Sequence, residues 1–380
     1  MTSNTGFMQD NQTTMPLLTH VTIIGLGLIG GSLCRAVRRF RPQTHLSGVD
    51  FPEVTTMALE QQMVDAAFAP EELPQACEQA DLIVIATPVA AARRVLLDLA
   101  ESAPGAAILT DVCSVKTDIV SMASELFRHG VPVFIGGHPM AGAEKPGLAN
   151  ADPFLFQNAL YVLTPGSDTP PEAVQALAGF VADLGAHPVL IDAATHDRIA
   201  AAVSHLPQLL AVALMNFVAE KNRDNPLYLK MAAGGFRDMT RIASSPYTIW
   251  KDILDSNYGP IQNEMQGFVD YLREMEQRLQ RGELEADFEN AAKSRLSIPT
   301  DTRGFLNPHF DISVEVEDRP GIIAAIATTL AEADINIKDI EVLKVRENEG
   351  GTLRLAFASQ SERQRAMELL RGRGFHCQTR

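Results

Sequence analysis

The first half of the chain alternates between two patterns of hydrophobic and polar positions. Continuous apolar runs are typical of strands buried on both faces of a parallel sheet, and segments of helical periodicity separate them. Strands are expected from Val21 to a glycine turn, before Asp50, and at residues 81–86, 106–112, 131–135, 159–164 and 188–191. Helices are expected over residues 55–61, 89–102 and 171–184, and from the 113–116 turn to about residue 129. This alternation predicts a doubly wound α/β domain over residues 19–192.

From Thr195 the apolar positions recur with a long helical period and no strand pattern. Thr195 is a candidate N-cap for a helix that runs to about Lys221. Pro207 predicts a kink in this helix, because proline lacks the N–H that a helix interior needs. Further helices contain Trp250 and residues 268–279, so we expect an all-α substrate and dimerisation domain over residues 193–296. Its apolar faces exceed what one short bundle can bury, which favours a homodimer.

The two ends of the chain have different patterns. Residues 1–18 are polar and lack the basic and apolar regions of a signal peptide, so we expect a disordered tail. Residues 297–309 contain prolines and a glycine typical of a linker. Residues 310–380 predict a third domain of order βαββαβ, with strands at 310–316, 335–345, 351–359 and 375–378, one helix from the 318–321 turn to residue 332, and another over 361–371.

Composition and charge limit the partners and the cellular compartment that we expect for this chain. The formal net charge of −15 argues against a nucleic-acid partner, which would favour a basic face. No apolar run is expected to span a membrane. The four cysteines lack metal-binding spacing and fit reduced packing residues; they are Cys34, Cys77, Cys113 and Cys377. We therefore expect a cytoplasmic protein without a metal, a membrane or a nucleic-acid partner.

A glycine turn after the first strand predicts a Rossmann-type dinucleotide site. The turn is followed by a helix and then by a strand that ends at an acid, Asp50, and it reads Gly25-Leu26-Gly27-Leu28-Ile29-Gly30. Gly25 permits the turn, Gly27 lets a pyrophosphate approach, and Gly30 allows close packing of helix and strand. Asp50 would bind ribose hydroxyls and repel a 2′-phosphate, which favours NAD. The nearby Arg38, Arg39 and Arg41 leave NADP use open.

Other polar residues are expected at the same edge of the sheet, because ligands bind outside the carboxyl ends of parallel strands. Thr87 and Pro88 follow one strand, and Ser114 and His138 follow the next two. A neutral His138 would take a hydroxyl proton while a hydride leaves the same carbon. An isolated histidine at such a place more often satisfies loop carbonyls, but the neighbouring cofactor site reverses that preference. Ser114 would assist His138, or it would be the N-cap of the next helix.

The predicted helical domain adds further candidates. Arg237 and Arg241 lie four residues apart and are expected on one helix face. Arg241 would bind a carboxylate in a bidentate manner, or would form a surface ion pair with Asp238. Two polar pairs, His196-Asp197 and Ser204-His205, recur on one predicted helix, where they would form a polar face or a network between domains. Their spacing matches no metal motif.

Five segments resemble the prephenate/arogenate dehydrogenase family. The segments are GLGLIGGSL (25–33), DVCSVK (111–116), GGHPMAGAEKPG (136–147), HDRIAAAVSHLPQ (196–208) and AAGGFRDMTRIASSPYTIW (232–250). The resemblance covers about residues 20–295, and its GGHPMAG and GGFRDxTRIA signatures are far more specific than the glycine turn. The last seventy-odd residues resemble an ACT domain, a small ligand-sensing module.

The resemblance implies NAD(P)-dependent oxidative decarboxylation of prephenate to 4-hydroxyphenylpyruvate in tyrosine biosynthesis. By motif position, His138 matches the catalytic histidine, Ser114 the serine that assists it and Arg241 the arginine that binds the substrate carboxylate. Positions that line the substrate site match Ser204, His205, Gly234 and Trp250. Gln208 stands where many prephenate-preferring relatives have a second histidine, so an arogenate or dual-specificity cyclohexadienyl dehydrogenase remains the alternative. The ACT domain would bind tyrosine or another amino acid, or would only enlarge the dimer interface.

Two other classes of protein compete with this interpretation. A two-domain dehydrogenase for a hydroxy acid would share the layout, but it would leave the GGFRDxTRIA signature unexplained. A cofactor-sensing regulator would have an ACT domain that responds to an amino acid, but no helix-turn-helix with a basic face is visible.

Overall fold

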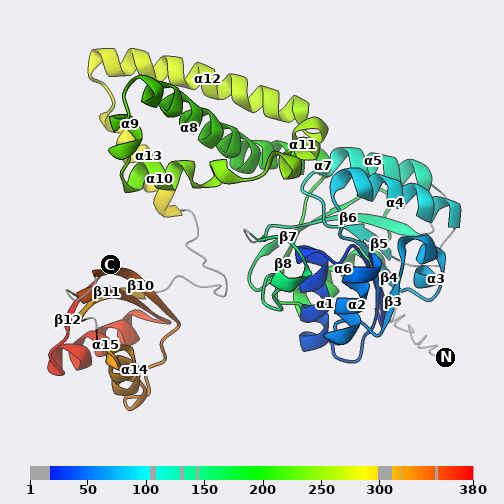
Figure 1. The fold of residues 1–380 in the computed structure, drawn as a ribbon, viewed down its shortest axis with the longest axis horizontal. Helices are drawn as coiled ribbons and strands as arrows, with labels where there is room; N and C mark the ends of the chain where they lie inside the picture. Colours follow the sequence, from blue (N-terminus) through cyan, green and yellow to red (C-terminus); the bar gives the residue numbers. More distant parts are fainter. Residues whose placement is uncertain are drawn as a thin grey trace, which may run out of the picture. The chain divides into compact units, whose positions relative to one another are not determined.

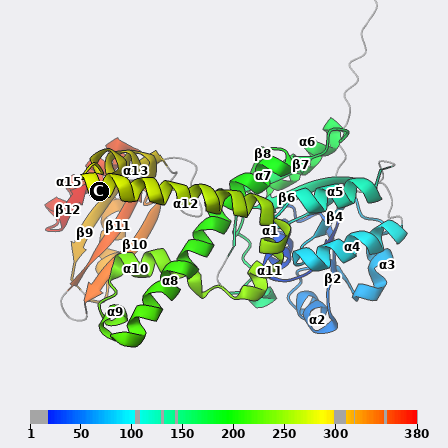
Figure 2. The same cartoon turned by 90° about the horizontal axis from the view of Figure 1, so that it is seen from above.

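The computed structural model describes residues 18–102, 108–128, 132–142, 145–297, 310–317, 319–346 and 350–379. Residues 1–17 of the expected disordered tail and nearly all of the expected linker lie outside these residues, whereas Leu18, which was expected in the tail, is buried in the core. The chain divides into two compact units, Met1–Ala286 and Asp287–Arg380. Figures 1 and 2 show a sheet domain followed by long helices in the first unit, and a small sheet with helices in the second.

An eight-stranded sheet of order β3-β2-β1-β4-β5-β6-β7-β8 forms the first part of unit 1. Its strands are β1 (His20–Ile24), β2 (His45–Val49), β3 (Ala66–Phe68), β4 (Leu82–Ile85), β5 (Ile108–Asp111), β6 (Val133–Pro139), β7 (Leu160–Pro165) and β8 (His187–Leu190). β1 to β6 pair in parallel, whereas β7 is antiparallel to β6 and parallel to β8. This Rossmann-like mixed sheet confirms the predicted fold class.

Helices cover both faces of the sheet and bury two apolar clusters. One cluster contains side chains of α1 (Leu28–Phe40), α2 (Pro52–Glu60) and α6 (Pro171–Asp183). The other contains side chains of α3 (Leu73–Cys77), α4 (Val89–Ser102) and α5 (Thr117–Leu126). All four residues of β4 are buried, as expected for a strand covered on both faces. The four cysteines are free and buried, which confirms that they are packing residues.

The predicted end of β6 was wrong. The expected strand stopped at Ile135, but β6 continues to Pro139, and His138 pairs with Val162 of β7. The antiparallel neighbour extends the strand through two glycines, so tertiary pairing overrides their low strand propensity. The connection between these strands contains one short helical turn, η2 (Leu148–Asn150), among the residues described there. An antiparallel pair needs no crossover helix.

A long helix opens the helical domain of unit 1. It runs from Ala193 to Asp224 as α7 (Ala193–Ala200), a π-helical segment η3 (Ala201–His205) and α8 (Leu206–Asp224). Asp192, rather than the predicted Thr195, is its N-cap, and its carboxylate accepts a hydrogen bond from the Thr195 N–H. The irregular η3 turn ends two residues before Pro207, which lies in the first turn of α8, in agreement with the predicted disturbance. The helix is long and apolar enough to span a membrane, so the expectation that no run would be was wrong on length and composition.

The remaining helices of this domain bury few side chains. They are α9 (Leu227–Lys230), α10 (Gly234–Thr240), η4 (Arg241–Ser244), α11 (Tyr247–Ser256) and α12 (Tyr258–Arg281). In α9 to α12 and η4, only Ile253 and Ile261 are buried within the elements. Large apolar side chains are exposed instead, among them Phe217, Leu227, Met231, Met239 and Leu279. The expected helix over 268–279 is longer than predicted.

Unit 2 contains α13 (Glu285–Ser297), nearly all of which lies in this unit, and a four-stranded antiparallel sheet of order β10-β11-β9-β12. Its elements are β9 (Phe310–Val316), α14 (Ile322–Ala331), β10 (Asp339–Arg346), β11 (Gly350–Phe357), α15 (Gln360–Gly372) and β12 (His376–Thr379). The βαββαβ prediction is confirmed, although β10 begins four residues later than expected. Ile312, Val314 and Leu355 lie in the apolar core of this sheet.

Candidate active site

The glycine turn has the geometry that a bound dinucleotide needs. Gly25 has φ +93°, and a Cβ there would come within 2.8 Å of the Ala86 carbonyl. A Cβ at Gly30 would overlap the Gly25 carbonyl, so only glycine lets α1 pack this close to β1. No atom of the described residues lies within 4 Å of a Cβ built at Gly27, the N-cap of α1. The N–H groups at this helix end face that space, which suits the pyrophosphate of NAD.

The acid and the polar side chain predicted for the cofactor lie beside this turn. Asp50 follows β2, and its carboxylate accepts hydrogen bonds from the N–H groups of Leu26 at 2.6 Å and Phe51 at 2.7 Å. These bonds hold the carboxylate where a ribose would lie, and they leave its remaining lone pairs for hydroxyl groups. Thr87 follows β4, and its Oγ1 is buried without a hydrogen-bond partner among the described residues. The residues present therefore fit NAD.

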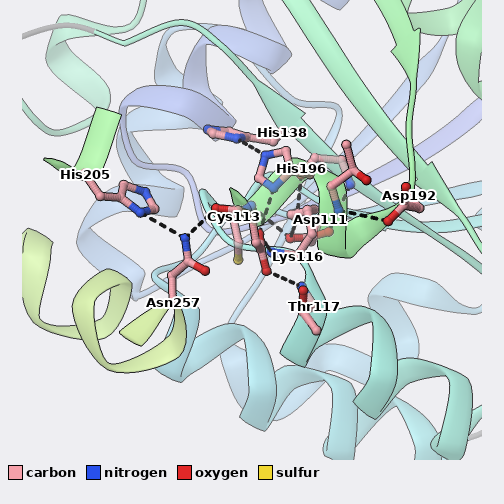
Figure 3. A network of polar contacts seen from close by, with 12 residues as sticks. Asp111, Cys113, Lys116, Thr117, His138, Asp192, His196, His205 and Asn257 are labelled. Atoms are coloured by element: carbon pink, nitrogen blue, oxygen red, sulfur yellow. Dashed lines mark hydrogen bonds and ion pairs between the residues drawn. The ribbon is translucent and has the colours of Figure 1, made fainter. Parts of the chain in front are cut away.

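His138 lies near the carboxyl end of β6, and its imidazole belongs to a chain of three side chains (Figure 3). Its Nδ1 lies 2.8 Å from Nε2 of His196, and Nδ1 of His196 lies 2.8 Å from Oδ1 of Asp197. The two imidazole rings are nearly perpendicular, at 71°. His196 and Asp197 are adjacent on α7, so the helical domain supplies two members of the chain and the sheet supplies the third.

This chain fixes which nitrogen of His138 is free. A carboxylate only accepts hydrogen bonds, so His196 must carry its proton on Nδ1. In the neutral imidazole Nε2 of His196 is then an acceptor, and Nδ1 of His138 must donate to it. Nε2 of His138 is left with its lone pair. The geometry thus presents Nε2 of His138 as a base. The ionised carboxylate of Asp197, which is linked to His138 through His196, stabilises the imidazolium.

Electrostatic effects keep His138 unprotonated and Asp197 ionised. Burial, and then the positive charge of Lys116, hold the pKa of His138 well below its usual range. Burial opposes the ionisation of Asp197, but hydrogen bonds from His196 and from the N–H groups of Thr117 and Lys116 lower its pKa overall. His138 is therefore neutral, and Asp197 negative, at neutral pH.

Asp197 also joins the helical domain to the sheet. Its carboxylate accepts the N–H groups of Lys116 and Thr117, each at 2.8 Å, and so caps the N-terminus of α5. Its carbonyl accepts a hydrogen bond of 2.8 Å from Nδ2 of Asn257, which also lies 3.1 Å from Nδ1 of His205. Burial lowers the pKa of His205 to about 4, so this ring is neutral. Trp250 lies edge-on to the same ring, with centroids 6.0 Å apart.

Of the other predicted catalytic and substrate-binding residues, Ser114 lies in the sheet domain and the rest lie in the helical domain. Ser114 is half-buried in the turn between β5 and α5, and Lys116, not Ser114, is the N-cap of α5. On the helical domain, Nε2 of the buried Gln208 donates to the carbonyl of Ile242 at 3.0 Å, which ties α8 to η4. Arg241 begins η4 instead of sharing a helix with Arg237, because α10 ends at Thr240. Ser204 lies in η3, and Gly234 is exposed at the start of α10.

Part of this arrangement does not follow from the sequence patterns. They predict a polar face or a network between domains for His196 and Asp197, and they predict no role for Lys116, Asp111 and Asn257. His196 and His138 lie 58 residues apart, so no local spacing links them. The available signal was the position of His196, Asp197, Asp111 and Lys116 inside the motifs that carry the resemblance.

A base at the edge of a sheet where a dinucleotide binds removes the proton of a hydroxyl group as a hydride leaves, which places the chain among the NAD-dependent dehydrogenases. Comparison with known proteins narrows this class. Residues 33–190 match the family model "Prephenate dehydrogenase, nucleotide-binding domain", residues 192–293 match "Prephenate dehydrogenase, dimerization domain", and residues 310–373 match "ACT domain".

Individual relatives agree with these matches. The chain is 34% identical to the prephenate dehydrogenase of Bacillus subtilis over 93% of its own length and 96% of that protein. A prephenate dehydrogenase of A. aeolicus, solved with hydroxyphenyl propionate and NAD+, is 27% identical, with a TM-score of 0.67 over 74% of this chain and 97% of that one. A Synechocystis arogenate dehydrogenase is 32% identical, with a TM-score of 0.65 over 73% and 98%. The chain belongs to the prephenate dehydrogenase family, and its cofactor is NAD.

Proposed function

We propose that the site at the carboxyl ends of β1, β4, β5 and β6 oxidatively decarboxylates prephenate to 4-hydroxyphenylpyruvate, with His138 as the general base. The observation that carries this proposal is the chain from His138 through His196 to Asp197, because it leaves Nε2 of His138 free to accept a proton. NAD, when bound, accepts the hydride from the ring carbon that carries the hydroxyl group.

His138 moves one proton in this reaction. Its Nε2 takes the hydroxyl proton as the ring carbon is oxidised, and the new carbonyl then draws the electrons that the departing carboxylate leaves behind. Carbon dioxide is released and the ring becomes aromatic, which makes the step irreversible. The ring oxygen is now a phenolate, and the imidazolium of His138 returns the proton to it. His138 therefore returns the same number of protons that it takes. Between these two steps the negative charge of Asp197 stabilises the imidazolium of His138.

Other residues would position the substrate. Ser114 has a half-buried hydroxyl group in the β5–α5 turn, where it would bond the same ring hydroxyl or orient His138. Arg241 would bind a substrate carboxylate, for which the planar guanidinium is suited. The positions Ser204, His205, Gly234 and Trp250 would line the rest of the substrate site, by their correspondence to the family motifs.

Gln208 favours a second candidate function, that of an arogenate or dual-specificity cyclohexadienyl dehydrogenase. One hydrogen of its Nε2 is donated to the Ile242 carbonyl, and Oε1 would accept from a ligand. An acceptor at this position suits the ammonium group of arogenate as well as a water on the pyruvyl group of prephenate. A histidine would offer a ring N–H donor to the pyruvyl group.

The substrate preference is testable with one substitution. We expect wild-type protein to have a higher kcat/KM with prephenate than with arogenate, and we expect Gln208→His to raise that ratio about tenfold, the effect of one added hydrogen bond to a charged group. NADH formation with each substrate measures both values, and an unchanged KM for NAD serves as the control. Equal or greater kcat/KM with arogenate in the wild type would support the second candidate.

We also propose that the protein is a cytoplasmic homodimer. The exposed apolar side chains of α8, α9 and α12 belong to the segment that matches a dimerization domain, so a second copy would cover them. This occupant also explains the apolar length of the α7–α8 helix without a membrane. The four buried free cysteines suit a reducing compartment.

The ACT unit would sense an amino acid, and tyrosine is the proposed effector. A cavity of about 390 Å³ lies at the turn before α14, where Gly321 has φ +87°. Its lining includes Arg319, Ile323 and Val342. The free N–H groups of the first turn of α14 would bind a carboxylate, and the apolar side chains would face a ring.

Feedback through this unit gives the next prediction. Tyrosine should lower the rate of NADH formation by the full chain, and this inhibition should disappear when residues 305–380 are removed. Phenylalanine and leucine, tested in parallel, show whether the phenolic hydroxyl is required. Inhibition that persists after the truncation would place the tyrosine site elsewhere and leave the ACT unit as added dimer interface.

A further inference from the structure

A buried charge pair contacts the main chain of Gly137, the residue before His138. The side chains of Lys116, at the N-cap of α5, and Asp111, at the end of β5, contact each other and are both 0% exposed (Figure 3). A buried ion pair is weak evidence for stability, because the cost of removing two charges from water offsets most of their attraction. The groups that the pair binds indicate a different role.

The pair holds both main-chain polar groups of Gly137, the residue before His138. The parallel ladder between β5 and β6 ends where Thr110 pairs with Ile135. Beyond this point Oδ1 of Asp111 accepts the N–H of Gly137 at 3.1 Å, and Nζ of Lys116 donates to the carbonyl of Gly137 at 2.7 Å. Two charged side chains thus replace a strand partner. On the opposite edge of β6, His138 pairs with β7, so its backbone is fixed from both sides.

The two glycines before His138 make room for this pair. A Cβ at Gly136 would clash with Oγ1 of Thr164 and would crowd the side chain of Lys116 at 3.3 Å. A Cβ at Gly137 would come within 2.5 Å of the Asp111 carbonyl. The two glycines of GGH are therefore a packing requirement: Gly137 lets β6 approach the main chain of Asp111, and Gly136 leaves room for Thr164 and for the side chain of Lys116.

We propose that Lys116, paired with Asp111, is a positioning residue of the reaction, which sets the place of His138 through the main chain of Gly137. This inference rests on the proposed role of His138 as the base. The imidazole also faces His196 and Asp197 from α7, and His205 from η3. Both of these histidines are hydrogen-bonded within the network, and Asp197 is paired with His196.

The charge of Lys116 affects His138 in a direction that can be measured. This charge lowers the pKa of His138, and only burial lowers it more. Its removal should raise that pKa, and because only neutral His138 accepts a proton, the acid limb of kcat/KM should move to higher pH. A purely structural lysine would lower activity without moving this limb.

Two substitutions separate the hydrogen bond from the charge. Lys116→Met should lower kcat about 10²-fold, the cost of a small misplacement of a catalytic group, and should move the acid limb upward. Lys116→Gln keeps a donor for the Gly137 carbonyl, so it should recover part of kcat while the limb remains shifted. Lys293→Met, which removes the same charge from an exposed position on α13, should change neither value.

Wild-type kcat in Lys116→Met, or a loss of kcat with an unmoved acid limb in both variants, would overturn the proposal. NMR titration of the His138 imidazole reads the same shift without any substrate, so a failure of the proposed function is distinguishable from a failure of this inference. Whether or not the variants fold, a wild-type His138 pKa at or above about 6.5 also contradicts the proposal.

Discussion

His138→Asn should lower kcat about 10²- to 10⁴-fold, the range that a general base contributes, with an unchanged KM for NAD. The asparagine amide reaches about as far as Nδ1 of the histidine, so it still donates to Nε2 of His196. It has no atom at the position of Nε2, so the substrate hydroxyl loses its proton acceptor. The rest of the network, including Asp197, remains in place, and the loss should appear in kcat.

The pH dependence provides a second readout of the same residue. The base is active when it is neutral, and its pKa lies below the usual value of a histidine, so the acid limb of wild-type kcat/KM should lie below pH ~6.5. This limb should vanish in His138→Asn. His45→Asn is a matched control. His45 lies at the amino end of β2, whereas His138 lies near the carboxyl end of β6, and the side chain of His45 is 49% exposed. Wild-type kcat in the His138→Asn variant would remove His138 as the base.

Arg241→Ala should raise KM for prephenate about 10- to 100-fold and lower kcat by much less. A hydrogen-bonded charge pair contributes about 1.5–3 kcal/mol, and this energy binds substrate and transition state almost equally. The carboxylate that departs as carbon dioxide loses its charge, so a tight grip on it in the transition state would oppose the reaction. Arg241 therefore binds and orients the substrate in this account.

Steady-state kinetics over a range of prephenate concentrations measure this division of labour. Arg273→Ala removes a guanidinium from an exposed position on α12 that forms an ion pair with Asp270, so it controls for the loss of a surface charge. A fall in kcat larger than the rise in KM would show that Arg241 acts in the transition state.

Local patterns predicted most of the fold. The run 81–86 is apolar without interruption after its first residue, and β4 within it is buried on both faces. The glycine turn and Asp50 predicted the order of the first elements, and Asp50 indeed binds the main chain of that turn. These features depend on residues close in sequence, where periodicity and backbone sterics act directly.

The end of β6 was not predictable in the same way. Two glycines and a proline around His138 are typical of a strand end, and only the pairing with β7 extends the strand. That pairing involves a partner more than twenty residues later, so no local pattern reports it. His138 consequently lies within a strand, where its backbone is better fixed than on a loop.

The supporting side chains were the hardest to predict. A lysine is almost never fully buried, so residue type gives no signal for the buried position of Lys116. The sequence predicts a polar face or a network between domains for Asp197, but it does not predict the partners in that network, which are α5, Asn257 and the histidine chain. Sequence motifs thus indicate the candidate residues of the site, whereas the structure shows which side chains they contact.

The coupling of oxidation to decarboxylation is tested most directly by product stoichiometry. Purified protein with prephenate and NAD should form NADH, carbon dioxide and 4-hydroxyphenylpyruvate in equal amounts. NADH formation from a simple 2-hydroxy acid without release of carbon dioxide, together with no turnover of prephenate or arogenate, would contradict the account.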